Sequence, residues 1–142
     1  MTSTLRPAQD IPSPASYGDA ERTGLAAENL RRGVTEHLFF TLGRSAATAT
    51  HHDLYMALSH AVRDRLMNRH LAYKEVLRNQ RPKAVAYLSA EFLIGPQLGN
   101  NLLMLGIRAE PEAAMRHFGI ASLEQLLAIE EEPGLGNAMP SV

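Results

Sequence analysis

The stretch at residues 83–89 constrains the fold of this chain more than any other feature of its sequence. It reads Lys-Ala-Val-Ala-Tyr-Leu-Ser, which is nearly all apolar and lacks the polar alternation of a half-exposed strand. Such a run is typical of a strand that is buried on both faces of a parallel sheet. Periodicity alone does not distinguish it from a short buried helix. Its position between Arg81-Pro82 and Gly95-Pro96 favours the strand.

A strand buried on both faces needs neighbouring strands, because its backbone N–H and C=O groups would otherwise lose their hydrogen bonds. The sequence offers no second convincing strand among its 142 residues. We therefore expect the chain to be mostly α-helical as it stands, with about five helices and one isolated strand near residues 83–89. We also expect it to be a fragment of a larger fold that supplies the missing strands.

Apolar residues at helical spacing predict where the helices lie. One apolar stripe begins after residue 19 and ends at Gly43, a residue type that often terminates helices. It consists of Leu25, Leu30, Val34, Leu38 and Leu42. Shorter helices are expected over residues 97–107, 111–118 and 123–131, the last with a capping box formed by Ser122 and Gln125.

A second, long helix is expected from residue 51 to about residue 79, because Thr50 and Asp53 resemble a capping box and Arg81-Pro82 stops the helix. Its apolar stripe includes Leu54, Leu58, Ala61, Val62 and Leu66. Basic residues are expected on its opposite, solvated face. They are Arg63, Arg65, Arg69, Lys74 and Arg78. The alternative is that this basic face binds an anion or a protein partner.

Composition excludes several classes of protein. The formal net charge of -1 argues against nucleic-acid binding, and the absence of cysteine excludes disulfide frameworks and thiolate zinc sites. No apolar run is long enough to span a membrane. Residues 1–18 contain three prolines and no signal-peptide core, so we expect a disordered tail. A cytoplasmic protein is the default expectation.

The histidines predict no metal site. His60 and Asp64 lie one helical turn apart, where they could bind a metal only with further ligands. A hydrogen bond between them at the helix surface is the simpler expectation.

Three stretches of the chain carry a resemblance to a known family. They are residues 52–65 (HDLYMALSHAVRDR), residues 87–101 with YLSAEFLIG and LGNN, and residues 129–137 (IEEEPGLGN). In this order they resemble the amino-terminal part of the α-1,4-glucan phosphorylases, the glycogen and starch phosphorylase family. The resemblance covers residues 28–137, so we expect residues 19–137 to be the amino-terminal portion of the family's first domain and residues 138–142 to be a divergent end.

The resemblance implies a glycosyltransferase of glycogen breakdown with a larger two-domain α/β fold. Members of the family cleave α-glucan with inorganic phosphate and release glucose 1-phosphate. They hold pyridoxal 5'-phosphate as a Schiff base, and the phosphate of this cofactor takes part in the proton transfers. The resemblance also implies a homodimer for the full-length protein.

Two sets of site residues follow from the resemblance. Glu91 matches the acidic residue at a strand end that faces the active-site cleft, where a carboxylate contributes to the electrostatics. Gly134, Gly136 and Asn137 match the start of the family's glycine-rich segment beside the cofactor phosphate. Glycines allow backbone N–H groups to approach an anion closely.

The chain also departs from its family. After Asn137 it continues Ala-Met-Pro-Ser-Val, where the family continues Gly-Gly-Leu-Gly-Arg, and its only lysines, Lys74 and Lys83, match no cofactor-bearing segment. We therefore expect a truncated chain that is inactive alone and does not bind the cofactor alone. The alternative is a stand-alone helical interaction or dimerisation module that uses residues 51–79, because that region lies near subunit contacts in the family.

Overall fold

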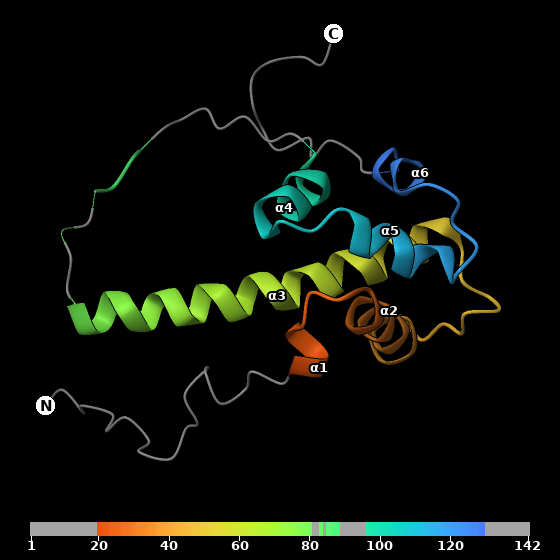
Figure 1. Cartoon of the computed structure of the whole chain (residues 1–142), viewed down its shortest axis with the longest axis horizontal. Coiled ribbons are helices and arrows are strands. Elements are labelled where there is room, and N and C mark those ends of the chain that lie inside the picture. The colour runs from red at the N-terminus through yellow and green to blue at the C-terminus, as the bar shows by residue number, and fades with distance from the viewer. Residues whose placement is uncertain (1–19, 81–82, 84, 89–95, 130–142) are drawn as a thin grey trace, which may run out of the picture.

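The computed structural model describes residues 20–80, 83, 85–88 and 96–129. Within these residues the chain is helical and contains no strand, which confirms the prediction of a mostly α-helical chain (Figure 1). The elements in chain order are α1 (Ala20–Thr23), α2 (Ala27–Glu36), the π-helix η2 (His37–Thr41), α3 (His51–Gln80), α4 (Gln97–Leu105), α5 (Ala109–Arg116) and α6 (Leu123–Leu127).

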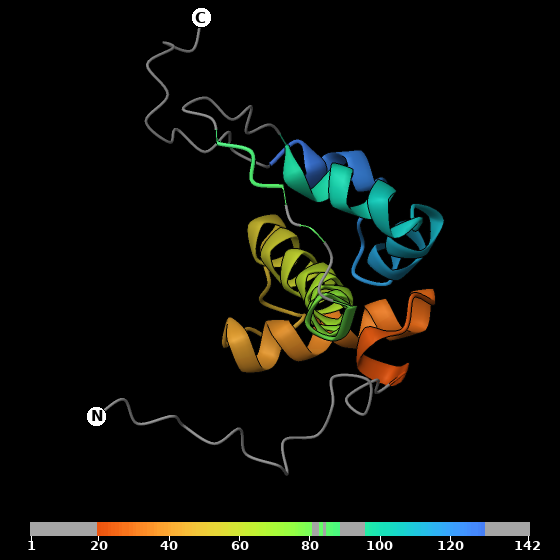
Figure 2. The same ribbon diagram turned by 90° about the vertical axis from the view of Figure 1, so that its left-hand side faces the viewer.

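The long helix α3 lies between two groups of shorter helices. Viewed along α3, α1 and α2 lie on one side of it and α4, α5 and α6 on the other (Figures 1 and 2). The two groups also meet directly, because α2 packs against α5 as well as against α3. Every buried residue of α3 falls within residues 54–65. The carboxyl-terminal half of α3 projects from this body without a buried side chain (Figure 1).

The core is one cluster of apolar side chains contributed by α2, η2, α3 and the three later helices. Leu30, Val34 and Leu38 of the predicted first stripe are fully buried, and α2 crosses α3 closely at Gly33. A Cβ atom at Gly33 would lie 3.3 Å from the Cβ of Ala61. The absence of a side chain at this position therefore brings the two helices together.

The first predicted helix differs from the structure in its continuity. It is divided into α1, α2 and η2, and its last turn is π-helical. The predicted end at Gly43 is confirmed: Gly43 has a φ of 63°, and the N–H of Arg44 donates to the carbonyl of Leu38 at 2.8 Å. A left-handed residue followed by an N–H that donates to a carbonyl of the last turn is a common way to end a helix.

The long helix begins and ends close to the predicted residues, and its capping box is confirmed. The N–H of Thr50 donates to Oδ2 of Asp53 at 2.9 Å, and the N–H of Asp53 donates to Oγ1 of Thr50 at 3.1 Å. The N–H and the hydroxyl of Thr50 both donate to the Asp53 carboxylate and hold the pKa of this carboxyl below its ordinary value. The N–H groups of Thr50 and Asp53, which have no partner within the helix, are thereby both paired.

Replacing Thr50 by alanine is expected to lower the free energy of unfolding by about 1 kcal/mol, because the loss of the Thr50 hydroxyl leaves the N–H of Asp53 without its acceptor. Urea denaturation followed by circular dichroism measures the loss. Thr35→Ala is the matched control, because the Thr35 hydroxyl only donates back to the carbonyl of Arg31 within α2. Equal losses in the two variants would contradict the capping role.

The shorter helices appear near the predicted places: α4 and α6 are shorter than predicted, whereas α5 has the predicted length but begins and ends two residues earlier. The predicted capping box of α6 is wrong in one residue. The N–H of Glu124 donates to Oγ of Ser122 at 3.2 Å, and the Ser122 hydroxyl donates back to the Glu124 carboxylate. The N–H of Gln125 is already used by the backbone carbonyl of Ser122 at 3.2 Å. The reciprocal partner is therefore two residues after the cap instead of three.

The predicted buried strand is wrong for residues 83 and 85–88, which have no regular structure. The side chains of Val85, Tyr87 and Leu88 are 95%, 81% and 92% exposed. The physical reason is that the described residues provide neither a second strand to pair with nor a layer on each face. Residues 84 and 89 lie outside the described residues, as do the predicted tail at 1–18 and the divergent end at 138–142.

Candidate functional site

The residues expected to form the active site lie outside the described part of the chain. Glu91 lies in the undescribed stretch between Leu88 and Pro96, and Gly134, Gly136 and Asn137 follow the last described residue, Ile129. Their assignment to a catalytic cleft therefore stays a prediction. The described residues define three other features: an apolar pocket, a polar cluster on Asp64 and a buried arginine.

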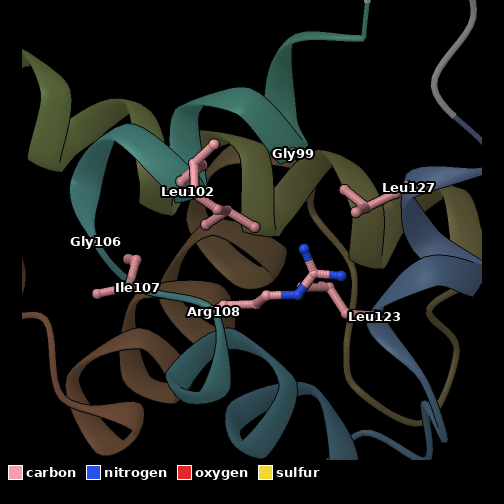
Figure 3. A pocket seen from close by; sticks show the side chains of 8 residues that line it. Gly99, Leu102, Gly106, Ile107, Arg108, Leu123 and Leu127 are labelled. Atoms are coloured by element: carbon pink, nitrogen blue, oxygen red, sulfur yellow. The ribbon is translucent and has the colours of Figure 1, made fainter.

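The pocket lies between α4 and α6 and has a volume of about 250 Å³ (Figure 3). Its walls are mostly apolar, and Figure 3 shows the Arg108 side chain extending across it toward Leu123. Arg108 Nη2 lies 2.9 Å from Oε1 of Glu124, so the guanidinium at the pocket is already neutralised. The pocket is lined by Gly99, Leu102, Leu103, Gly106, Ile107, Arg108, Leu123 and Leu127.

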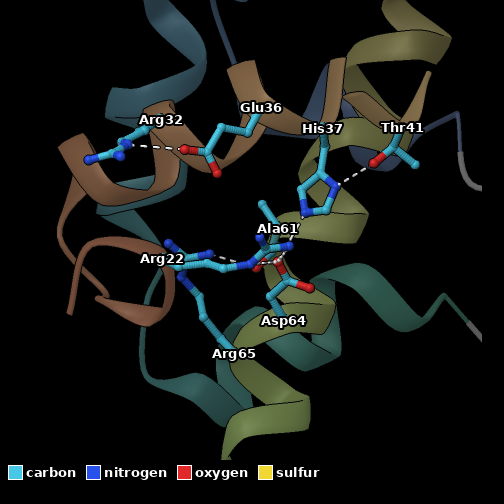
Figure 4. Close-up of polar contacts among 8 residues, drawn as sticks. All are labelled: Arg22, Arg32, Glu36, His37, Thr41, Ala61, Asp64 and Arg65. Carbon is cyan, nitrogen blue, oxygen red and sulfur yellow. Dashed lines mark hydrogen bonds and ion pairs between the residues drawn. The ribbon is translucent and has the colours of Figure 1, made fainter. Parts of the chain in front are cut away.

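The polar cluster joins three helical elements through the carboxylate of Asp64 on α3 (Figure 4). Oδ2 of Asp64 accepts a hydrogen bond from Nε of Arg22 on α1 at 2.9 Å and lies 3.1 Å from Nε2 of His37 on η2. Asp64 is mostly buried. The cluster therefore fastens α1 to α3 through the Arg22–Asp64 ion pair and η2 to α3 through the contact between His37 and Asp64.

The predicted pairing of His60 with Asp64 is replaced by another arrangement. Asp64 contacts His37, and the His60 ring stacks on the ring of His37 with a centroid distance of 5.3 Å. Burial lowers the pKa of His60, and His37 and Arg63 act in the same direction against the opposing effect of Asp64. Within residues 20–80, 83, 85–88 and 96–129, no group of three potential metal ligands occurs.

Arg65 is the one charged residue of the described chain that is buried, at 2% exposure. Its Nη1 donates to the carbonyl of Ala61 at 2.6 Å (Figure 4). Its Nε donates to the carbonyl of Gly24 at 2.9 Å. Nη2 has no partner. The side chain thus connects the turn between α1 and α2 to α3, at the cost of one unpaired nitrogen.

The prediction of a solvated basic face on α3 is wrong for Arg65 and holds for its neighbours. Arg63, Lys74 and Arg78 are exposed, and Arg78 pairs with Glu75 one turn away. Arg69 is exposed, and its Nη1 and Nη2 donate to the carbonyls of Met104 and Leu105, each at 3.4 Å.

Among the described helices, none combines the length and apolar character that a membrane crossing requires.

Comparison with known proteins gives a consistent set of relatives. The chain is 45% identical over 125 residues to the glycogen phosphorylase of Synechocystis, a match that covers 88% of this chain. It is 39% identical over 108 residues to the brain form of glycogen phosphorylase from Bos taurus and to the liver form from Homo sapiens. Each of these two matches covers 76% of the chain. No protein-family model matches the chain.

The chain is homologous to one part of the glycogen phosphorylases. It spans only 15% of the length of the Synechocystis relative and 13% of the two animal relatives. The resemblance inferred from the three sequence stretches is thereby confirmed. The pocket, the Asp64 cluster and Arg65 therefore lie in a chain that corresponds to a small part of these relatives.

The sequence did not indicate the contact of His37 with Asp64, and it placed Arg65 on the solvated face of α3 although Arg65 is buried. Arg65 could have been found, because it follows Leu58 by seven positions and Ala61 by four and so continues the buried stripe of α3. His37 gave no comparable signal, since its partner Asp64 is 27 positions away in the sequence and on another helix.

Proposed function

We propose that the protein to which this chain belongs is a glycogen phosphorylase, which cleaves α-glucan with inorganic phosphate and releases glucose 1-phosphate. The observation that carries this proposal is the 45% identity over 88% of the chain to the Synechocystis enzyme of that name. The relatives are far longer than the chain, so the activity is proposed for the whole protein. The chain by itself is proposed to be inactive.

The same proposal assigns roles to the predicted site residues. Glu91 would contribute a carboxylate to the cleft, where a fixed charge orients hydrogen-bond donors and stabilises charge that develops on the substrate. The backbone N–H groups at Gly134, Gly136 and Asn137 would approach an anion, because glycine leaves the backbone accessible. The substrates would be α-glucan and inorganic phosphate, the assembly a homodimer and the location cytoplasmic.

The described residues do not form a site that fits pyridoxal phosphate. The pocket between α4 and α6 contains no lysine for a Schiff base, and its one cation, Arg108, is paired with Glu124. Lys74 is exposed on the projecting half of α3, and Lys83 is exposed in the segment that follows. A cofactor would therefore depend on groups other than the described residues.

A second candidate function is supported by the exposed apolar side chains of the projecting half of α3. Leu71, Tyr73 and Val76 are all exposed there. A helix that presents apolar side chains to water is suited to packing against another helix. This supports a helical interaction or dimerisation module without catalysis. Sedimentation analysis of the chain tests it, since a module would give a stable dimer that dissociates when Leu71 and Val76 are replaced by serine.

A grafting experiment tests the phosphorylase proposal. We expect the Synechocystis enzyme to keep phosphorolysis within about tenfold, equal to about 1.4 kcal/mol, when its matched residues are replaced by those of this chain. The measurement is glucose 1-phosphate formation from glycogen and phosphate. The enzyme with the segment deleted and the chain alone are controls that are expected to form none. A folded graft that binds cofactor but forms no product would contradict the proposal.

A further inference from the structure

Two histidines meet where η2 packs against α3. The rings of His37 on η2 and His60 on α3 stack with centroids 5.3 Å apart and planes inclined by 27°. The His37 ring is held at both nitrogens, since Nε2 lies 3.1 Å from Oδ2 of Asp64 and Nδ1 lies 2.9 Å from Oγ1 of Thr41 (Figure 4). The His37 side chain is only 12% exposed. This histidine pair is therefore a main polar contact between η2 and α3.

The charged groups around the histidine pair provide no carboxylate for a second imidazolium. Asp64 faces the pair from α3 and is already bonded to Arg22 of α1 at 2.9 Å. Arg63 of α3 adds a further positive charge near His60. Glu36, the last residue of α2, is bonded to Arg32 at 3.1 Å. A protonated His60 would therefore add a positive charge beside Arg63 without a carboxylate of its own, and like charges at close separation repel.

The direction of the pH effect follows from His60. Its pKa in the folded chain is lowered from 6.5, first by burial and then by His37 and Arg63. The unfolded or opened state therefore binds a proton at a higher pH than the closed state does. The contact is fully stable above pH 6.5, and its stability falls as the pH decreases toward the lowered pKa.

We propose that the histidine pair is an acid-sensitive latch, which holds η2 on α3 while His60 is neutral and releases η2 when His60 is protonated. Release would be local, because Leu38 is the single buried residue of η2, whereas α3 is fixed by many buried side chains.

The released element η2 carries Phe39 and Phe40, which are 65% and 80% exposed and contact each other edge to face. The latch would thus set the order of an aromatic surface. A π-helical turn is often found at such functional positions.

Hydrogen exchange of the 142-residue chain tests the latch. We expect the amides of residues 37–44 to lose protection by about tenfold or more between pH 7.5 and pH 5.5, after correction for intrinsic exchange rates. The amides of residues 54–62 are expected to keep theirs. A uniform change across both segments, or no change in either, would overturn the proposal.

Three variants separate the latch from a general acid effect. His60→Gln is expected to abolish the pH response of residues 37–44. His70→Gln, which changes an exposed histidine on the same helix, is expected to keep the response. Asp64→Asn is expected to shift the opening to higher pH, because the one counter-charge is lost.

If His60→Gln responds like the original chain, the proposal fails. If that variant does not fold, an NMR titration of the original chain decides, and a His60 ring that titrates at or above its ordinary pKa overturns the latch.

Discussion

Replacing Arg65 by alanine is expected to lower the free energy of unfolding of this chain by about 3 kcal/mol. The substitution removes a fully buried side chain and leaves the carbonyl of Gly24 without its donor, 2.9 Å away in the structure. The Gly24 carbonyl is partly buried, so part of the cost of its desolvation is no longer compensated. The loss also frees the turn between α1 and α2 from α3, so the amino-terminal helices are expected to loosen first.

Urea denaturation followed by far-UV circular dichroism measures this effect, provided that the transition is cooperative. Arg63→Ala is the matched control, because Arg63 is exposed on the same helix two positions earlier. It is expected to change the stability by less than about 0.5 kcal/mol. Arg65→Met keeps most of the packing and removes the unpaired Nη2, so its loss should fall between the two. Equal stability of Arg65→Ala and Arg63→Ala would show that the buried hydrogen bonds contribute nothing.

Arg65 also shows why the sequence pattern of α3 predicts the wrong environment for one residue. Its spacing from Leu58 and Ala61 places it on the buried face, but its charge predicts exposure, and charged residues are rarely fully buried. The structure resolves this conflict because the side chain reaches backbone carbonyls at Gly24 and Ala61. One of these acceptors lies 41 positions away. No local pattern in the sequence could have indicated it.

The elements that were predicted well are those fixed by local chemistry. The capping box of Thr50 and Asp53 and the stop at Arg81-Pro82 place α3 within one residue at its end. Gly43 ends the first helical region by adopting a left-handed conformation that other residues avoid. The predicted strand is wrong at residues 83 and 85–88 for the opposite reason. Their apolar sequence predicts burial, but burial needs partners, and the described residues contain none for Val85 and Leu88.

Within the active graft described above, replacing Glu91 by glutamine is expected to lower kcat/KM for phosphorolysis by about 100-fold. Glutamine keeps the size of the side chain but removes the charge, so the loss reports the electrostatic contribution of the carboxylate. The effect should fall mainly on kcat, because a charge that acts on the developing transition state changes KM little. Glucose 1-phosphate formation at several glycogen concentrations separates the two parameters.

Glu110→Gln in the same graft provides the comparison, because Glu110 lies in the first turn of α5, is not one of the predicted site residues, and undergoes the same change of charge. It is expected to keep kcat/KM within about twofold, since surface substitutions have small effects. Matching circular dichroism spectra and equal cofactor content would show that both variants fold. If Glu91→Gln then retained the activity of Glu110→Gln, Glu91 would not be the cleft carboxylate, although the chain would still be part of a phosphorylase. The graft tests the function of the segment, whereas this pair tests one residue within it, so the two proposals can fail separately.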